Sequence, residues 1–266
     1  MLLLSGSELL SLPAASSASA LPNRAGTPLR MMAIAGVERR RVPVSLGGDP
    51  PLMLHVDEVA DWSWWDRESE APGSNPYGAK LWPAALAIAE HLAALPASAL
   101  QDLSVLELGC GNGLCSMAAA ARGASRVVAS DLSADALQLT REAVARQKLS
   151  VDTLQLDLGD RSTPLPPADL VIAADLLYDD TLAAHVATRV AEAIQRGSWV
   201  IVGDARRAGR EAFMQKLREV SAGTPPCFGP STSVRLKAVG WKQKHVDLMH
   251  VNTPSCLTDA QDDLQG

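Results

Sequence analysis

The chain has 266 residues, of which 47% are apolar and 20% charged, and its formal net charge is −6. This length and apolar content are enough for one α/β domain of roughly two hundred residues with looser ends. An acidic chain lacks the excess of Lys and Arg that nucleic acids and anionic membranes bind, so both are excluded as main partners. Small molecules or other proteins are the expected partners.

The cysteines and histidines do not predict a metal site. The four cysteines show no C-x-x-C spacing, and the five histidines show no H-E-x-x-H spacing. No apolar run reaches the roughly 18 residues that a membrane span requires. We therefore expect a soluble protein without metal or disulfides, in a reducing compartment, and we expect a monomer.

Residues 1–41 differ in composition from the rest of the chain. They hold many serines among alanines and leucines, then several arginines, and only Glu8 and Glu38 are acidic. This composition is typical of a transit peptide for a chloroplast or mitochondrion. The alternative is a disordered extension without an address on a cytoplasmic protein.

Residues 42–80 carry alternating apolar positions and the aromatic run Trp62-Ser63-Trp64-Trp65. The alternation predicts a short hairpin or cap beside the main domain, because the segment is too small to fold alone. The tryptophans either pack the cap or gate a substrate site, and the first reading is favoured.

From residue 81 to residue 252 the expected elements alternate between strand and helix. Strands are predicted at Ser104–Leu108, Arg126–Ser130, Val151–Leu156, Leu170–Ala174 and Trp199–Gly203. Helices are predicted at Pro83–Leu95, Leu114–Arg122, Ala134–Gln147, Leu182–Gln195 and Gly209–Val220. Ser233–Val239 and Trp241–Val251 indicate a final antiparallel hairpin. The pattern predicts a Rossmann-like α/β sheet that is parallel except for this hairpin, with helices on both faces, before a flexible tail at 253–266.

A glycine-rich turn follows the first strand of this domain. It contains Gly109, Gly111 and Gly113, whereas dinucleotide-binding turns have the spacing G-x-G-x-x-G. The third glycine therefore comes one residue too early for a nicotinamide cofactor, and an oxidoreductase is disfavoured.

Acidic residues at the strand ends select the ligand class. Glu107 ends one strand, where it would repel a pyrophosphate and attract an ammonium group. Asp131 ends the next strand, where its two oxygens can accept both hydroxyls of a ribose. Asp157 ends the third, where an adenine amino group is expected. Since parallel strands end at one edge of the sheet, the three acids predict S-adenosylmethionine, which carries positive charge and no phosphate.

Glu107 to Gly113, Asp131 and Asp157 resemble the motifs of class I, seven-stranded S-adenosylmethionine-dependent methyltransferases. Leu81-Trp82-Pro83-Ala84-Ala85 and Ala174-Asp175-Leu176-Leu177-Tyr178 resemble methyltransferase family 16, whose members mostly methylate lysine in other proteins. Gly203-Asp204-Ala205-Arg206-Arg207 partly resembles the Gly-Asp-Pro-Gly-Arg motif of the branch that modifies the electron transfer flavoprotein β subunit. The resemblance covers roughly residues 81–203.

The resemblance and the strand ends together give a set of cofactor-binding residues. These are Trp82, Glu107, Gly109, Cys110, Gly111, Gly113, Asp131, Leu132, Asp157, Leu158 and Ala174. Many relatives have Trp where this chain has Leu158, so adenine would lie against an aliphatic side chain, with Trp82 as the remaining aromatic platform.

The resemblance implies that Asp175 and Tyr178 act on the acceptor. Asp175 would capture and align a lysine ammonium, and Tyr178 would accept a hydrogen bond or pass a proton to water. The alternative for the pair is a helix cap and a packing aromatic. The expected activity is methyl transfer to a lysine of a protein substrate; a small-molecule N- or O-methyltransferase and an inactive cofactor-binding scaffold remain the rivals.

Overall fold

A computed structural model describes residues 34, 37–70, 75–96, 98–221, 232–236 and 244–252. Most of the expected transit segment, the Pro/Gly-rich loop after residue 221 and the expected tail at 253–266 lie outside these residues. Within them, the helix and strand positions expected from residue 81 onward are confirmed to within a few residues.

A seven-stranded sheet forms the centre of the molecule, in the order β5-β4-β3-β6-β7-β9-β8. Its strands are β3 Ser104–Leu108, β4 Arg126–Asp131, β5 Asp152–Gln155, β6 Leu170–Ala174, β7 Trp199–Asp204, β8 Thr232–Leu236 and β9 Lys244–Val251. All neighbours from β5 to β7 pair in parallel, and β9 pairs antiparallel with both β7 and β8. The parallel sheet with a C-terminal antiparallel hairpin is therefore confirmed.

The strand order reverses between β3 and β6. From β3 the chain moves outward to β4 and β5, then returns to the other side of β3 with β6 and β7. In open α/β sheets the loops on either side of such a reversal diverge and leave a crevice at the carboxyl ends of the strands. The topology therefore places a binding crevice above β3 and β6.

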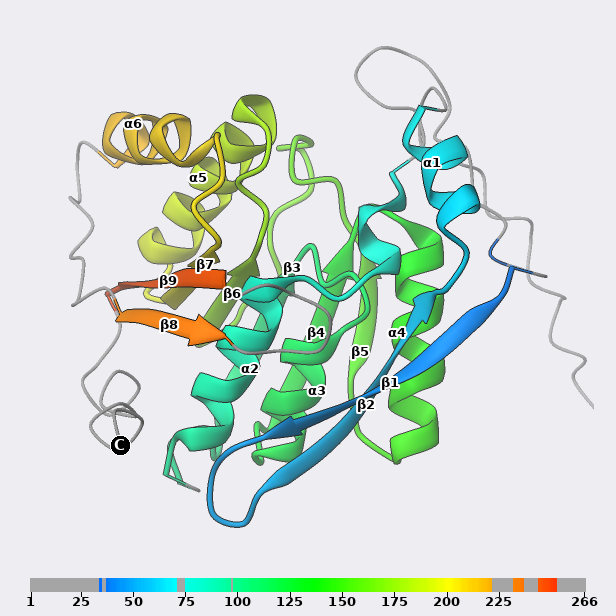
Figure 1. The fold of residues 1–266 in the computed structure, drawn as a ribbon. Coiled ribbons are helices and arrows are strands. Elements are labelled where there is room, and N and C mark those ends of the chain that lie inside the picture. Colours follow the sequence, from blue (N-terminus) through cyan, green and yellow to red (C-terminus); the bar gives the residue numbers. More distant parts are fainter. Residues whose placement is uncertain are drawn as a thin grey trace, which may run out of the picture.

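Helices cover both faces of the sheet (Figure 1). On one side lie α2 Pro83–Ala94, α3 Leu114–Ala121 and α4 Ala134–Gln147; on the other lie α5 Asp180–Gln195 and α6 Arg210–Val220. The strands alternate accordingly: in β3, Val105 packs with the α2–α3–α4 cluster, whereas Leu106 and Leu108 pack with the α5–α6 cluster. Glu107 has the same parity as Val105 and points toward α3.

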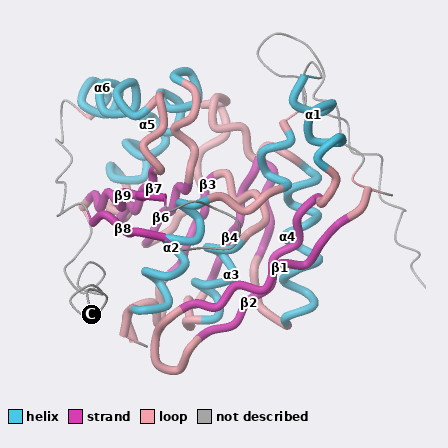
Figure 2. The backbone as a smooth tube through the Cα atoms, viewed as in Figure 1, coloured by secondary structure: helices cyan, strands magenta, loops and turns pink. Residues whose placement is uncertain are grey.

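The N-terminal segment adds a two-stranded antiparallel sheet, β1 Arg39–Leu46 and β2 Leu52–Val59. Figure 2 shows this hairpin crossing the outer side of α3 and α4. The sequence placed the boundary of the N-terminal extension after residue 41, but β1 already begins at Arg39. Arg39 pairs with Glu142 of α4 at 2.9 Å and Arg40 pairs with Glu58 of β2 at 2.7 Å, so these basic residues belong to the hairpin.

The aromatic run of the cap forms a helix rather than part of a hairpin: α1 spans Trp62–Glu70. Trp64 is buried in a small core with Val59 and Leu139, which confirms a packing role for this tryptophan. A 3-10 turn, η1 Pro76–Ala79, then leads to Trp82, the residue before α2. Its N-cap is Asn75, whose side chain accepts a hydrogen bond from the Tyr77 N–H.

Two buried histidines meet where α2 packs on β9. The rings of His91 and His250 lie 5.1 Å apart, edge to face, and both nitrogens of His250 lack a hydrogen-bond partner among the described residues. Burial, with a smaller contribution from His91, lowers the pKa of His250 to about 4. His250 is therefore neutral in the folded protein at neutral pH, and its side chain takes up a proton when the protein unfolds in acid.

This histidine predicts a loss of stability in acid. Because the folded pKa lies below the ordinary value of 6.5, the neutral side chain contributes stability above pH 6.5 that is lost as the pH falls toward 4. The loss amounts to up to about 3 kcal/mol of unfolding free energy. Urea titrations at several pH values should show a shallower pH dependence for His250→Leu. His245→Leu, at an exposed position of the same strand, should keep the wild-type slope; equal slopes for all three proteins would contradict the assignment.

Candidate functional site

A cavity opens at the carboxyl ends of β3, β4 and β6, where the strand order reverses. Twelve of the thirteen site residues expected from the sequence line it: Trp82, Glu107, Gly109, Cys110, Gly111, Asp131, Leu132, Asp157, Leu158, Ala174, Asp175 and Tyr178. Residues from five different loops and strand ends are thus brought to one cavity.

Gly113 does not line the cavity. It is the N-cap of α3, and a Cβ added to it would lie 2.5 Å from a methyl carbon of Thr140 on α4. This glycine lets α3 and α4 approach each other, which differs from the contact with the cofactor expected from the sequence.

The loop between β3 and α3 forms the floor of the cavity and needs a left-handed backbone. Gly111 has φ +54°, and a Cβ added there would lie 3.3 Å from the Gly78 carbonyl oxygen. Its N–H donates to Asp131 Oδ2 at 2.9 Å. The absence of a side chain therefore lets η1 close over this loop.

Glu107 is the most deeply buried acid of the cavity, with 1% of its surface exposed. Its Oε2 accepts hydrogen bonds from the Ser116 N–H at 2.8 Å and the Ser116 hydroxyl at 2.5 Å. Burial outweighs these bonds and raises its pKa to about 7. A cation placed beside Glu107 would favour the ionised form.

Asp131 and Asp157 are each held by a backbone turn. Asp131 also accepts from the Ser133 N–H at 2.8 Å, and burial raises its pKa. Asp157 accepts from the Gly159 N–H at 2.7 Å. Each bond occupies only part of a carboxylate's capacity, so both acids retain lone pairs for a ligand in the cavity.

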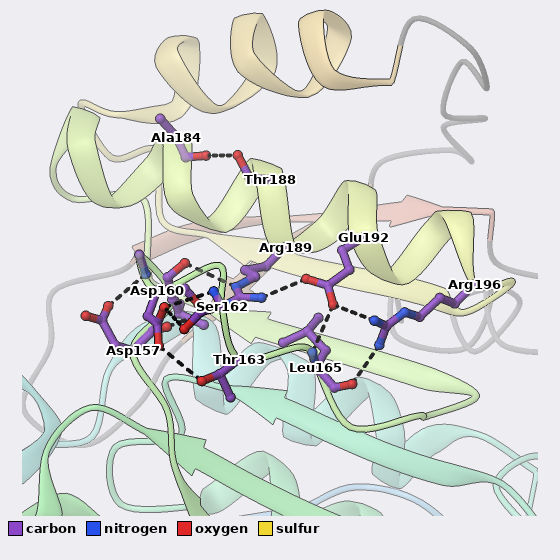
Figure 3. A network of polar contacts seen from close by, with 12 residues as sticks. Asp157, Asp160, Ser162, Thr163, Leu165, Ala184, Thr188, Arg189, Glu192 and Arg196 are labelled. Atoms are coloured by element: carbon purple, nitrogen blue, oxygen red, sulfur yellow. Dashed lines mark hydrogen bonds and ion pairs between the residues drawn. The ribbon is translucent and has the colours of Figure 1, made fainter. Parts of the chain in front are cut away.

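The loop after β5 carries Asp157 and Leu158. It is held in place by α5, which lies on the other face of the sheet from α2, α3 and α4 (Figure 3). Arg189 of α5 is fully buried and donates to the carbonyl oxygens of Leu158 and Asp160. Its charge is paired with Glu192 at 2.7 Å. One buried guanidinium therefore holds the cavity wall against α5.

Both oxygens of Asp175 are occupied by protein groups. Oδ2 accepts from the Ala84 N–H in the first turn of α2 at 2.9 Å, and Oδ1 pairs with Arg207 Nε at 2.7 Å. The Arg207 guanidinium also lies 5.2 Å from the ring centroid of Trp82. Asp175 thus binds the start of α2, far away in the sequence, while still lining the cavity. The helix that follows it is capped by Asp179 instead, so the alternative role of Asp175 as a cap for that helix is wrong.

Aromatic rings surround the mouth of the cavity. The rings of Tyr77 and Tyr178 lie 5.1 Å apart, and Trp65 and Trp82 each lie within 6.2 Å of Tyr77. Burial raises the pKa of Tyr178 to about 12, so its phenol stays protonated at neutral pH. Tyr77 is 40% exposed and marks the outer side of the mouth.

The sequence did not identify several residues of the cavity. Asn75, Tyr77, Lys80 and Asn112 line it, and Arg207 acts through Asp175 and Trp82. Asn112 stands inside the glycine turn and could have been found there. Tyr77 had no signal, because its position depends on how η1 folds back over the glycine loop.

Two absences bear on the chemistry. The described residues contain no group of three or more His, Cys, Asp or Glu side chains that could hold a metal ion. No helix among them is long and apolar enough to cross a membrane.

Comparison with known proteins identifies the family. The sequence profile of a family described as "Lysine methyltransferase" matches residues 68–220, more than half of the chain. The chain belongs to this family, methyltransferase family 16. It is 33% identical over 146 residues to the human electron transfer flavoprotein β subunit lysine methyltransferase, and the match covers 50% of each chain. It is 30% identical over 162 residues to the mouse protein of the same name, and this match covers 59% of this chain and 62% of the relative. The chain thus spans about half to three fifths of these relatives.

A solved structure supports the fold. The 16S rRNA N2 G1207 methyltransferase of T. thermophilus, solved with AdoMet and guanosine, superposes with a TM-score of 0.52 at 16% identity, covering 80% of this chain and 50% of that chain. The family 16 protein therefore has the class I methyltransferase fold. Its membership of this methyltransferase family gives S-adenosylmethionine as its cofactor.

The cavity fits this cofactor. Its charged lining consists of the carboxylates of Glu107, Asp131, Asp157 and Asp175 against one amine, Lys80. An acidic lining suits a sulfonium and an ammonium and disfavours phosphates.

Substitution of Gly111 tests the floor of the cavity. Gly111→Ala should weaken binding of S-adenosylhomocysteine at least about tenfold, because the added Cβ forces the loop away from η1. Gly123→Ala is the matched control: Gly123 also has positive φ, +89°, but no atom lies within 4 Å of an added Cβ. Both variants should lose about 1–2 kcal/mol of stability from backbone strain. Calorimetric titration should find weaker binding only for Gly111→Ala; equal affinity in the two variants would refute the role of this contact.

Proposed function

We propose that the protein transfers a methyl group from S-adenosylmethionine to a lysine side chain of another protein. The observation that carries the proposal is the open, aromatic mouth of an acidic cavity. The exposed Tyr77 ring and the half-buried Tyr178 ring, whose centroids lie 5.1 Å apart, would form an aromatic surface against which the four-carbon stem of a lysine can pack. The description of the family and the names of the human and mouse relatives support the same acceptor.

The acids of the cavity would hold the cofactor in the order of their strands. Glu107 would pair with its ammonium group, Asp131 would accept the two ribose hydroxyls, and Asp157 would accept from the adenine amino group. Leu158 would pack against the adenine ring on one side. When bound, S-adenosylmethionine supplies a methyl group on a positively charged sulfur, from which a neutral amine displaces it in line.

The protein must deliver the lysine as a neutral amine. An ordinary lysine has a pKa near 10.4, so forming the amine at neutral pH costs about 4 kcal/mol. The aromatic walls partly dehydrate the acceptor, which lowers its pKa and reduces this cost. The protonated Tyr178 phenol can accept one hydrogen bond from the amine and orient its lone pair, but it cannot serve as a phenolate base.

Asp175 would act mainly by position. Because its oxygens already bind Ala84 N and Arg207 Nε, we assign it the task of holding α2 and Trp82 at the mouth. The sequence analysis expected Asp175 to capture and align the lysine ammonium, and this proposal gives it mainly a positioning role instead. Direct contact between Asp175 and the acceptor stays a prediction.

The two alternative functions, a small-molecule methyltransferase and an inactive scaffold, lead to different expectations for the cavity and its activity. A small-molecule methyltransferase needs a closed pocket above Tyr178, whereas here Tyr77, which lines the cavity and contacts Trp65 of α1, is exposed. An inactive scaffold would bind the cofactor and methylate nothing. Import into a chloroplast or mitochondrion is a further part of the proposal and is supported by the composition of residues 1–41.

Cofactor binding should depend on pH through Glu107. Because burial raises its pKa to about 7, the carboxyl is partly protonated at neutral pH and must ionise to pair with an ammonium. Affinity for S-adenosylhomocysteine should therefore rise between about pH 6 and about pH 8, with proton release on binding. Glu107→Gln keeps an acceptor for Ser116 and should bind more weakly without this pH dependence. A variant with the wild-type pH profile would exclude Glu107 as the titrating group.

The acceptor can be found directly. Purified protein incubated with radiolabelled methyl donor and fractionated chloroplast or mitochondrial extract should label a protein on lysine, located by mass spectrometry. Tyr178→Phe should lower the rate about tenfold or more without changing S-adenosylhomocysteine binding, because it removes the hydroxyl that would orient the amine and that also bonds to the Asn75 side chain. Label in small molecules alone would favour the first rival, and cofactor binding without any label would favour the second.

A further inference from the structure

Asn75 connects the 3-10 turn η1 to Tyr178. Its Oδ1 atom accepts a hydrogen bond from the Tyr77 N–H at 3.3 Å, which makes Asn75 the N-cap of η1. Its side chain also forms a hydrogen bond with the Tyr178 phenol, and this bond lowers the pKa of the phenol against the larger effect of burial. A donor has this effect on a phenol, and Oδ1 is already an acceptor. The amide NH₂ group of Asn75 therefore donates to the Tyr178 oxygen.

Neighbouring contacts keep this pair of side chains in place. The rings of Tyr77 and Tyr178 lie 5.1 Å apart, so residues of one short segment contact the tyrosine with both a ring and an amide. The turn η1 in turn rests on the floor of the cavity, because a Cβ added to Gly111 would lie 3.3 Å from the Gly78 carbonyl oxygen. Asn75 and Tyr178 both line the cavity. The segment that closes over the glycine loop thus also contacts the tyrosine that follows β6.

The hydrogen bond from Asn75 restricts what the phenol can do. A hydroxyl group offers one donor and two acceptor positions. Since Asn75 occupies one acceptor position, the Tyr178 oxygen keeps one lone pair for a ligand, and its O–H points away from the amide. An amine that donates an N–H to this remaining lone pair has its own lone pair turned away from the phenol. Asn75 can therefore supply orientation to a reacting amine without touching it.

We propose that Asn75 is a positioning residue, whose side-chain amide holds the Tyr178 hydroxyl in the orientation that receives the acceptor amine. The inference rests on the proposed function, since it concerns the acceptor of methyl transfer. The competing explanation is that Asn75 only caps η1. Asn75→Asp separates the two roles, because the carboxylate has nearly the same size and still caps the turn but has no N–H to donate. Asn75→Ser is a second, neutral cap whose shorter side chain does not reach both groups.

The hydrogen bond can be tested without knowing the acceptor. The chain has two tyrosines, Tyr77 and Tyr178, so Tyr77→Phe protein made with fluorotyrosine carries the label at position 178 alone. Fluorine NMR then follows the ionisation of this phenol. Adding Asn75→Ala should raise its pKa by about one unit, because a donor to the phenolate is lost. Asn75→Asp should raise it at least as far, since it also adds a negative charge. An unchanged titration in both variants would overturn the proposal.

Methyl transfer tests the consequence of the hydrogen bond. In the full chain, Asn75→Asp and Asn75→Ser should each lower the initial rate of lysine labelling in organelle extract by about five- to tenfold. Binding of S-adenosylhomocysteine should stay unchanged. In Tyr178→Phe protein the same substitutions should lower the rate by less than about twofold, because the hydroxyl that Asn75 orients is already absent. Wild-type rates in both variants, or equal losses with and without the Tyr178 hydroxyl, would show that Asn75 does not act through Tyr178.

Failure of this inference and failure of the proposed function look different. If the wild-type protein labels no lysine, the proposed function fails, and the fluorotyrosine titration still decides whether Asn75 holds the hydroxyl. If the wild-type protein labels lysine and both Asn75 variants do so at the full rate, the proposed function stands and the positioning role is wrong.

Discussion

The carboxylate of Asp131 is the interaction on which the cavity depends most. One oxygen accepts from the Gly111 N–H and the other from the Ser133 N–H, so a single side chain ties the loop after β3 to the loop after β4. Hydrogen bonds to an ionised acceptor are about twice as strong as neutral ones. Because these bonds are buried, water screens them little. The relative position of these two loops, which both line the cavity, is thereby set by one residue.

The outer walls are fixed by two arginines from the other half of the sheet. Arg189 reaches from α5 to the carbonyl groups of the loop after β5. Arg207 reaches from the loop after β7 to Asp175 and the Trp82 ring. Each guanidinium is a rigid fork that makes several contacts at once, which suits it to holding loops that have no strand ladder of their own. The loops after β3, β4 and β5 thus supply three of the four acids, and two arginines from α5 and the loop after β7 hold the walls.

The sequence predicted the sheet well because its strands are short apolar runs, such as Leu170–Ala174, that owe their burial to pattern alone. It also predicted that the acids at the strand ends line the cavity, since parallel strands end at one edge, but it missed Tyr77 and Asn112. It could not predict what those side chains bind. Asp175 meets Ala84 and Arg207 at separations of 91 and 32 residues, which no local pattern encodes.

Packing at glycines was equally hidden. Gly109, Gly111 and Gly113 share one motif and a positive φ, but only the first two line the cavity, because the third faces Thr140 of α4. The aromatic run of α1 likewise gave no period that separates strand from helix. In the structure it is a helix whose Trp64 packs in a small core with Val59 and Leu139.

The electrostatics of the cavity connect stability with ligand choice. Glu107 has a pKa of about 7 instead of 4.5, so ionising it in the free protein costs about 3 kcal/mol. The free energy of unfolding therefore falls as the pH rises from 4.5 to about 7. A bound cation recovers this energy, whereas a phosphate would add to it. The same burial that destabilises the free protein therefore makes the cavity select a positively charged nucleoside. The desolvation cost of the carboxylates arises in the cavity, where a bound cation can offset it.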